Sequence, residues 1–256
     1  MKILITNDDS IESLGLKELA SALMRVGDVY VVAPKAPQSA GSHATTLHKP
    51  LRVEEFSLGV GEKLALRVSG TPSDCVVLAL DVLVKDGIDI VVSGINKGPN
   101  LGDDVIYSGT VAGAMEGAIN GRLSFAFSVN DFENPDFKFT ANFASFFLKY
   151  IWELEIRDNV CFNVNVPNLP ADKIKGCKFT RLARRLYVER VLIGKDPFDH
   201  DFFWIGGKLK DDYFEGTDSW AVKEGYVAIT PLRIDITDYS FLEKMSKVNL
   251  ELPKEL

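Results

Sequence analysis

The chain has 256 residues, of which 46% are hydrophobic and 25% are charged, and its formal net charge is -7 at pH 7. This composition is ordinary for a globular protein and excludes the disordered and collagen-like classes. The acidic balance argues against a nucleic-acid-coating surface, because neutralising phosphates needs a basic face. The length allows one large α/β domain, or one domain with an appended arm.

The cysteines and the N-terminus bear on the cellular compartment. Cys75, Cys161 and Cys177 are widely spaced and form no C-x-x-C pair, which fits neither a disulfide framework nor a zinc ribbon. Apolar runs stay well below the roughly 18 residues of a membrane span, and the chain opens with a strand pattern in place of a secretion signal. We therefore expect a soluble, cytoplasmic protein that makes no membrane contact.

The first strand leads into an acidic turn. Residues 3–6 are apolar or β-branched and predict a buried strand, and Asn7, Asp8 and Asp9 follow it directly. Two adjacent carboxylates at a strand end are costly unless a cation neutralises them. An alternative is that the three side chains only form a turn and cap the next helix.

Residues 16–24 carry apolar side chains at helical spacing, and residues 28–33 predict a second buried strand. The loop that follows, residues 35–50, is longer than the two to six residues usual for such a connection. Long loops in compact domains are often functional, which singles out Ser39 as its polar residue of interest.

Residues 51–69 predict an extra strand pair, and the next helix begins with Thr71 as N-cap and Pro72 in the first turn. The apolar residues of that helix predict a core face. They are Val76, Leu78, Ala79, Val82 and Leu83. Residues 89–93 predict another buried strand.

The segment 94–121 is rich in glycine, so its backbone can pass close to a ligand. Ser108, Gly109 and Thr110 cap a helix of small residues whose first N–H groups form an anion site. The alternative is that the glycines serve close packing of helix on sheet. The segment is neither a Walker loop nor a G-x-G-x-x-G fingerprint, so nucleotide sites of those two kinds are unsupported.

Residues 123–128 and 159–166 predict two further strands, with a helix over 135–152 between them. We expect the aromatic residues of this helix to face the core. They are Phe139, Phe143, Phe146, Phe147 and Tyr150, together with Ile151.

The character of the chain changes after residue 177. The cluster Arg181, Arg184 and Arg185 is expected to be solvated, although acidic partners are an alternative. Further expected features follow in order: a hairpin of residues 186–194 and 201–207, an acidic loop 208–219, a strand 226–230, a helix 241–247 and a polar tail. We expect residues 1–177 to form the α/β core and residues 178–256 an oligomerisation element.

Strands that alternate with helices predict an α/β fold: a Rossmann-like, doubly wound, mostly parallel sheet, with a C-terminal β-hairpin arm and a terminal helix. Ligands of such sheets bind beyond the carboxyl ends of the strands. This rule places the Asp8–Asp9 turn, the Ser39 loop and the Asn96 loop at one edge.

Several motifs, taken together, resemble those of the SurE family of nucleotidases. They occur in the family's order over nearly the whole chain: ITNDDS, APKAPQSAGSHATT, SGTPSDC, SGINKGPNLGDDVIYSGTVAGAMEGA, FTRLARR and VKEGYVAITPL. The resemblance implies a metal-dependent enzyme that removes phosphate from nucleoside 5′- and 3′-monophosphates, with polyphosphate as a further candidate substrate. It implies metal ligands at Asp8, Asp9, Ser39 and Asn96, and a homodimer or homotetramer that exchanges its C-terminal portion.

Two carboxylates, a hydroxyl and an amide carbonyl suit one hard divalent cation such as Mg²⁺ or Mn²⁺, and suit zinc poorly. Four protein donors leave positions for water and a phosphate oxygen, and the cation would lower the pKa of that water for hydrolysis. Asp8 or Asp9 is the candidate to orient or deprotonate it. The expected phosphate contacts are Asn96, Asn100, Ser108, Gly109 and Thr110.

The chain departs from the family pattern at three positions. Ser10 and Ala40 stand where the family usually has glycine, and Gln38 stands where many relatives carry arginine. Serine tolerates a positive φ less well than glycine, so the geometry of the acidic turn is the open point. The competing function is a non-catalytic phosphate or nucleotide sensor resembling a receiver domain, which also carries an acidic pair after its first strand.

Overall fold

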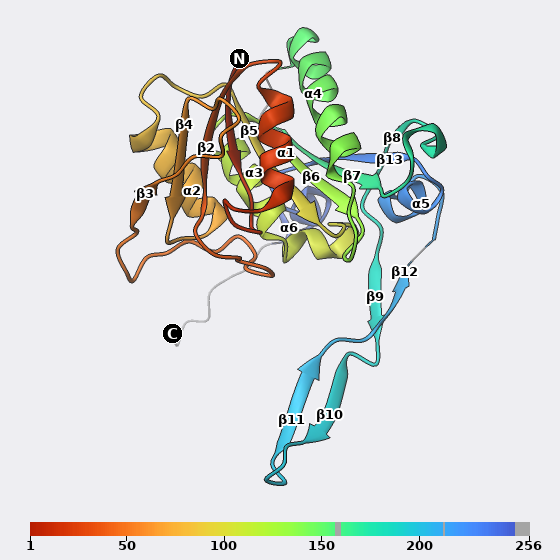
Figure 1. The fold of residues 1–256 in the computed structure, drawn as a ribbon. Coiled ribbons are helices and arrows are strands. Elements are labelled where there is room, and N and C mark those ends of the chain that lie inside the picture. Colours follow the sequence, from red (N-terminus) through yellow and green to blue (C-terminus); the bar gives the residue numbers. More distant parts are fainter. Residues whose placement is uncertain (157–159, 212, 249–256) are drawn as a thin grey trace.

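The computed structural model describes residues 1–156, 160–211 and 213–248. Its centre is a nine-stranded sheet with the order β3-β4-β2-β1-β5-β6-β7-β13-β8 (Figure 1). The strands of this sheet are β1 (Lys2–Thr6), β2 (Asp28–Pro34), β3 (Val53–Glu55), β4 (Leu64–Val68), β5 (Ile90–Lys97), β6 (Leu123–Asn130), β7 (Cys161–Pro167), β8 (Cys177–Phe179) and β13 (Val227–Leu232).

Six consecutive strands of the sheet, from β4 to β7, run parallel, as the alternating pattern predicts. β3 pairs antiparallel with β4, and β13 pairs antiparallel with β7 and parallel with β8. The predicted fold class is therefore confirmed. β2 lies on one side of β1 and β5 on the other, so the direction of winding reverses at β1. Such a reversal opens a crevice at the carboxyl ends of the two diverging strands.

Helices cover both faces of the sheet. α1 and α4 pack side by side on one face and bury the larger core cluster, while α2 and α3 cover the other face (Figure 1). The helices and helical turns are α1 (Leu14–Leu23), α2 (Pro72–Leu78), α3 (Gly109–Ile119), α4 (Phe137–Glu153), α5 (Asp218–Lys223), α6 (Tyr239–Met245), η1 (Ala79–Leu83), η2 (Gly102–Ile106) and η3 (Ala171–Lys173). No helix of the described ranges is long and apolar enough to cross a bilayer.

The helix starts follow the sequence signals. Thr71 caps α2 in a reciprocal capping box with Asp74, and Pro72 occupies the first turn. The predicted core face of this helix is wrong at Val82, whose side chain is exposed, because the chain continues beyond α2 as the π-helical turn η1 and the register of the face shifts.

α4 requires a similar correction. Phe147 and Ile151 are buried, but Phe146 and Tyr150 are exposed, so the prediction that both face the core is wrong. Phe146 stacks on Tyr150 along the outer face of the helix. Some aromatic residues of α4 therefore lie outside the face that packs on the sheet.

Residues 185–211 leave the body as a long arm, and the chain then returns to the body as α5, β13 and α6 (Figure 1). The strands of the arm are β9 (Arg185–Val188), β10 (Val191–Lys195), β11 (Asp201–Ile205) and β12 (Lys208–Asp211). β10 pairs with β11, as predicted, and β9 pairs with β12. The predicted acidic loop 208–219 is therefore wrong in its first part, where β12 forms. Residue 159, where the last core strand was expected to begin, and the polar tail 249–256 lie outside the described residues.

Candidate active site

The acidic turn follows β1 at the point where the winding reverses. The alternative that Asp8 and Asp9 cap the next helix does not hold, because Ser13 is the N-cap of α1 and its hydroxyl accepts from Leu16 N–H. Asn7 supports the turn instead, donating through Nδ2 to the Ser10 carbonyl oxygen at 2.8 Å and to Ser13 Oγ at 2.8 Å. Neither carboxylate is therefore needed as the cap of α1.

Asp8 lies beneath the N-terminus of α3. Its side chain is only 6% exposed, and the Thr110 hydroxyl donates to Asp8 Oδ1. A Cβ placed on Gly109 would lie 2.8 Å from Asp8 Cβ, so glycine is required at this position by the close approach of helix and carboxylate. Burial raises the pKa of Asp8 to about 6, opposed by the Thr110 hydrogen bond and reinforced by the charge of Asp9.

Asp9 is more open than Asp8. Burial raises the pKa of Asp9 as well, and the backbone N–H of Lys97 and the positive charge of Lys97 oppose the shift. The Lys97 N–H donates to Asp9 Oδ2 at 3.2 Å, which ties the acidic turn to the end of β5. Two buried or half-buried carboxylates with raised pKa values form a site that a divalent cation would stabilise.

The long loop after β2 is fastened to this turn. Gln38 N–H donates to the Asp8 carbonyl oxygen at 2.8 Å, and Ser42 N–H donates to the Tyr107 carbonyl oxygen at 3.0 Å. These two contacts hold Ser39 between the acidic turn and the η2 segment. Ser39 itself is exposed, so its hydroxyl is accessible from the cavity that it lines.

Asn96 stands near the end of β5, after an irregularity in its pairing with β6. Its Nδ2 donates to the Gly98 carbonyl oxygen at 2.9 Å. Because the nitrogen end of the amide is engaged by its own loop, the carbonyl oxygen is the end available to a ligand. The amide oxygen is therefore the candidate donor to a ligand in the cavity that Asn96 lines.

The predicted residues come together in one cavity of about 310 Å³. Asp8, Asp9, Ser39 and Asn96 all line it, as does Ser108. In the described parts of the chain, no three His, Cys, Asp or Glu side chains cluster as a candidate metal site. The donor set of two carboxylates, one hydroxyl and one amide oxygen nevertheless fits a hard cation, which prefers oxygen ligands.

The predicted phosphate contacts differ in what the structure lets them do. Ser108 lines the cavity and caps α3, its Oγ accepting from Val111 N–H at 3.0 Å. Asn100 also lines the cavity, but its Nδ2 donates to Ser128 Oγ at 2.8 Å and its backbone is held by Asn163 and Asn165. Its side chain is therefore partly committed to a buried polar network.

The hydroxyl of Thr110 is already committed to Asp8, and the predicted phosphate contact of Thr110 stays a prediction. Its side chain is fully buried, and its hydroxyl holds Asp8. The Asp8 carboxylate thus takes the place at the start of α3 where the sequence suggested that phosphate binds. The small residues of this helix also serve packing, because a Cβ on Gly113 or Gly117 would collide with side chains of β1, β5 or β6.

Some residues that line the cavity were not predicted from the sequence. The charged and aromatic ones among them are Lys97, Asp104, Tyr107 and Phe132. Lys97 was predictable from its place directly after Asn96, since the strand end that positions one side chain also positions its neighbour. Phe132 was predictable as well, because it lies in the loop after β6, at the carboxyl end of the strand next to β5.

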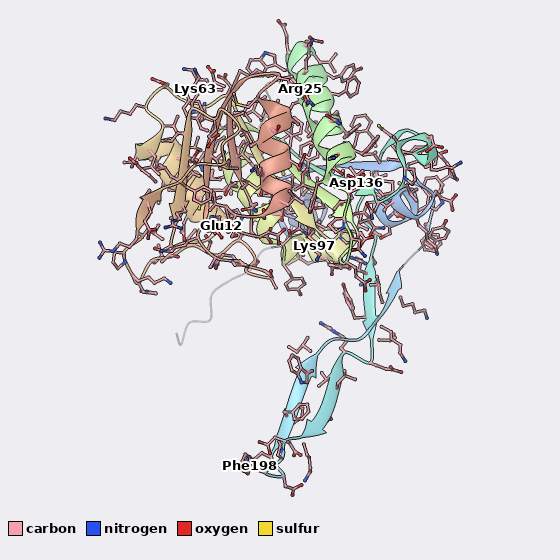
Figure 2. All side chains as sticks on the ribbon, viewed as in Figure 1. Glu12, Arg25, Lys63, Lys97, Asp136 and Phe198 are labelled. Atoms are coloured by element: carbon pink, nitrogen blue, oxygen red, sulfur yellow. The ribbon has the colours of Figure 1, made fainter. Side chains whose placement is uncertain are left out.

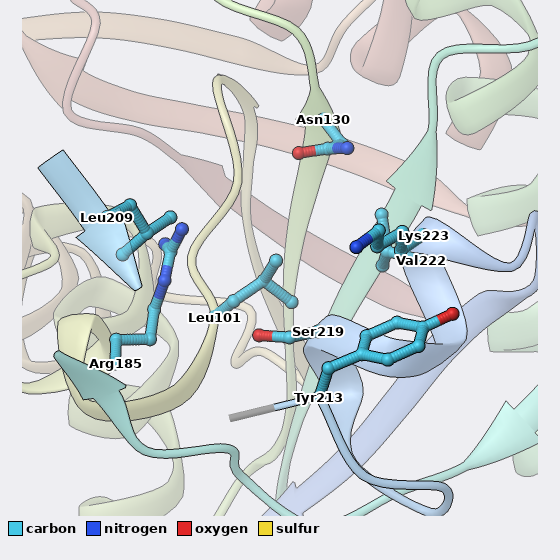
Figure 3. Close-up of a pocket in the computed structure, with 8 residues that line it drawn as sticks. All are labelled: Leu101, Asn130, Arg185, Leu209, Tyr213, Ser219, Val222 and Lys223. Atoms are coloured by element: carbon cyan, nitrogen blue, oxygen red, sulfur yellow. The ribbon is translucent and has the colours of Figure 1, made fainter. Parts of the chain in front are cut away.

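A second cavity of about 360 Å³ lies at the root of the arm (Figure 3). Arg185 and Leu209 of the paired strands β9 and β12 line one side of it, and Tyr213 and Lys223 line another. The predicted metal ligands are not among its lining residues. A third cavity, of about 750 Å³, lies beside α3, where His43 Nε2 pairs with Glu116 Oε2 at 2.7 Å.

The arm is anchored to the segment that borders the acidic cavity. The Arg185 guanidinium contacts Asp104 Oδ2 at 2.7 Å, and the side chain of Arg185 is only 8% exposed. The prediction that the basic cluster is solvated is therefore wrong for Arg185, because Asp104 neutralises it. The buried Asp218 adds a second tie, accepting from Gly102 N–H and Ala183 N–H at 2.8 Å each.

Comparison with known proteins identifies the family of this chain. The family model described as Survival protein SurE matches residues 3–189. The chain belongs to the SurE family. A relative from Moorella thermoacetica named 5'-nucleotidase SurE is 45% identical over 247 residues, covering 96% of this chain and 95% of its own length. A SurE relative from Aeromonas hydrophila with the same name is 45% identical over 244 residues, covering 94% and 96%.

A solved structure extends the SurE comparison to three dimensions. The crystal structure of the SurE protein from Aquifex aeolicus superimposes with a TM-score of 0.84 at 40% identity. The match covers 96% of this chain and 98% of that one. The predicted family resemblance and fold class are thus both confirmed.

The two residues that replace the usual glycines of the SurE pattern both have left-handed backbone. Ser10 has a φ of 88° and Ala40 a φ of 55°. Residues with a Cβ pay a steric cost in this region, which glycine does not. The acidic turn and the loop after β2 therefore each contain one residue in a strained backbone conformation.

We expect Ser10→Gly to raise the free energy of unfolding by roughly 1 kcal/mol, because relief of strain at φ 88° outweighs the added chain entropy of glycine. Urea unfolding of the metal-free protein measures the change. Ser10→Ala is the matched control, since it removes the hydroxyl and keeps the Cβ. A glycine variant no more stable than the alanine variant would contradict the assignment of strain.

Proposed function

We propose that this protein is a divalent-cation-dependent nucleotidase that hydrolyses nucleoside 5′-monophosphates to nucleoside and phosphate. The observation that carries the proposal is the meeting of Asp8, Asp9, Ser39 and Asn96 in one cavity at the carboxyl ends of β1 and β5. The names of the relatives support the substrate class. The proposal extends to 3′-monophosphates and polyphosphate, which share the phosphoryl group.

Asp8, Asp9, Ser39 and Asn96 would hold one Mg²⁺ or Mn²⁺. When bound, the cation would neutralise charge on the phosphoryl group and acidify water in the cavity. Asp8 supplies charge rather than proton transfer, because Thr110 fixes one of its oxygens and α3 covers it. In this proposal, the negative charge of Asp8 attracts the cation to the cavity.

Asp9 is the better candidate to orient the attacking water and take its proton. It lines the cavity and is less buried than Asp8, so its carboxylate is the more accessible of the two to water. Lys97 stands beside it and also lines the cavity, where its positive charge would attract the phosphate oxygens. The Ser108 hydroxyl, at the start of α3, would donate to another phosphate oxygen.

A panel assay tests the proposal directly. The purified chain is incubated with 5′- and 3′-nucleoside monophosphates and with polyphosphate in the presence of Mn²⁺, and released phosphate is measured. We expect multiple turnovers on 5′-monophosphates. Binding of nucleotide without any released phosphate would contradict the enzyme and favour the sensor.

We also propose that the protein assembles as a homodimer or homotetramer through its C-terminal portion. The arm supports this proposal, because Leu192, Ile193, Phe203 and Trp204 are exposed on a two-stranded ribbon. Phe198 lies at the tip of the arm, away from the body (Figure 2). An isolated ribbon of this kind is marginally stable in water until another surface covers it.

A further inference from the structure

The proposed ligands account for only one end of a nucleotide. Carboxylates, hydroxyls and a lysine recognise a cation and a phosphate, whereas the nucleobase is a flat aromatic group that needs an apolar surface. This inference rests on the proposed function and concerns where that base lies. Aromatic side chains that line the acidic cavity are the candidates for such a surface.

Phe132 is such a side chain. It is 67% exposed and lines the same cavity as Asp8 and Asp9. Its ring lies directly against the backbone of Gly98, where a Cβ would come within 2.1 Å of the ring. Gly98 in turn accepts the Asn96 amide through its carbonyl oxygen. The Phe132 ring therefore contacts a residue, Gly98, that is hydrogen-bonded to the proposed cation ligand Asn96.

The loop that carries Phe132 is fixed in place. Asp131 Oδ1 accepts from Glu133 N–H at 2.7 Å and from Asn134 N–H at 2.9 Å. Asp131 Oδ2 accepts from Asn168 Nδ2 at 2.7 Å, and Asn168 Oδ1 accepts from Asp136 N–H at 2.9 Å. The hydrogen bonds to Asp131 hold its pKa below the usual range. An exposed apolar ring is therefore presented on an ordered loop instead of being buried.

Exposed aromatic residues are common on protein surfaces, and exposure alone assigns no role. Phe146 on α4 is exposed to a similar degree, at 63%, and stacks on Tyr150 of its own helix. Phe132 differs because its ring shares a cavity with the acidic pair. Tyr107, 60% exposed, lines that cavity as well, so the region around the proposed phosphate position contains further aromatic surface.

We propose that Phe132 is the platform on which the nucleobase of the substrate stacks. Stacking involves the aromatic face that every nucleobase has, and it makes no hydrogen bond to the edge of the base. The site then tolerates all bases and favours the larger purines. Phe132 acts on substrate binding and takes no part in proton transfer.

The test compares AMP with ribose 5-phosphate, which carries the same phosphate and sugar without the base. For Phe132→Ala we expect the ratio of kcat/KM on AMP to kcat/KM on ribose 5-phosphate to fall roughly tenfold, mainly through the KM for AMP. Phe132→Trp should retain the ratio, because it keeps an aromatic face. Phe146→Ala is the matched control and should leave the ratio unchanged.

Two outcomes overturn the proposal. In one, Phe132→Ala keeps the wild-type kcat/KM on both substrates. In the other, kcat/KM falls equally on both substrates, which would mean that the ring only supports the Gly98 loop. Calorimetric titration with AMP and ribose 5-phosphate gives the same comparison as dissociation constants. It separates this inference from the proposed function, because an inactive wild-type protein would contradict the nucleotidase while the titration still decides the role of Phe132.

Discussion

Replacing Asp8 or Asp9 with asparagine is expected to lower phosphate release by about a thousandfold or more. Either change removes a charged oxygen from the proposed cation ligands, and asparagine keeps the size of the side chain. The fold should survive. Asp8 is buried with a pKa raised to about 6, so a neutral side chain there relieves an unfavourable charge and should raise the melting temperature of the metal-free protein.

Phosphate release from AMP with Mn²⁺ measures the loss of activity, and circular dichroism measures the fold. The matched control is Asp81→Asn, an exposed aspartate in the η1 turn, which should keep the wild-type rate. A folded Asp9→Asn protein with wild-type activity would contradict the site assignment. If a variant is inactive because it is unfolded, it will show no melting transition. This measurement distinguishes loss of the fold from loss of the site.

Chelation with EDTA is expected to abolish activity, and added Mg²⁺ or Mn²⁺ is expected to restore it. The proposed ligands are all oxygen atoms, so Zn²⁺, which favours nitrogen and sulfur, should restore less. Cation binding should also raise the melting temperature, since a ligand that binds only the folded state stabilises it. The shift should be absent in Asp9→Asn, which gives a readout besides activity. An enzyme insensitive to the chelator would rule out the oxygen-ligand site.

The meeting of the acidic turn, the Ser39 loop and Asn96 was predictable from the sequence. Parallel strands bring their carboxyl ends to one edge, so loops far apart in the chain converge there without any knowledge of side-chain contacts. The same argument could not place Thr110. Its position at a helix start suggested a phosphate contact, but only the three-dimensional structure shows that Asp8 lies against the start of α3 and accepts the Thr110 hydroxyl.

The errors elsewhere have similar causes. Helical periodicity marked Phe146 and Tyr150 as core residues because they are aromatic, whereas the width of the buried stripe is set by how α4 lies on the sheet. Arg185 looked like a surface charge because its partner, Asp104, is about 80 residues away in the chain. Local patterns identify elements well, but they do not identify which partner a long polar side chain will meet.

The order of strands at the edge of the sheet has a consequence for synthesis on the ribosome. The residues that line the acidic cavity lie between Asp8 and Phe132, so all of them are made before the arm, α5 and β13. β8 ends at Phe179, but its neighbour in the sheet is β13, which ends at Leu232. Chains fold from the N-terminus as they emerge. The residues of the cavity are therefore available to the nascent protein early. β8 can pair with β13 only after the arm and α5 have been translated.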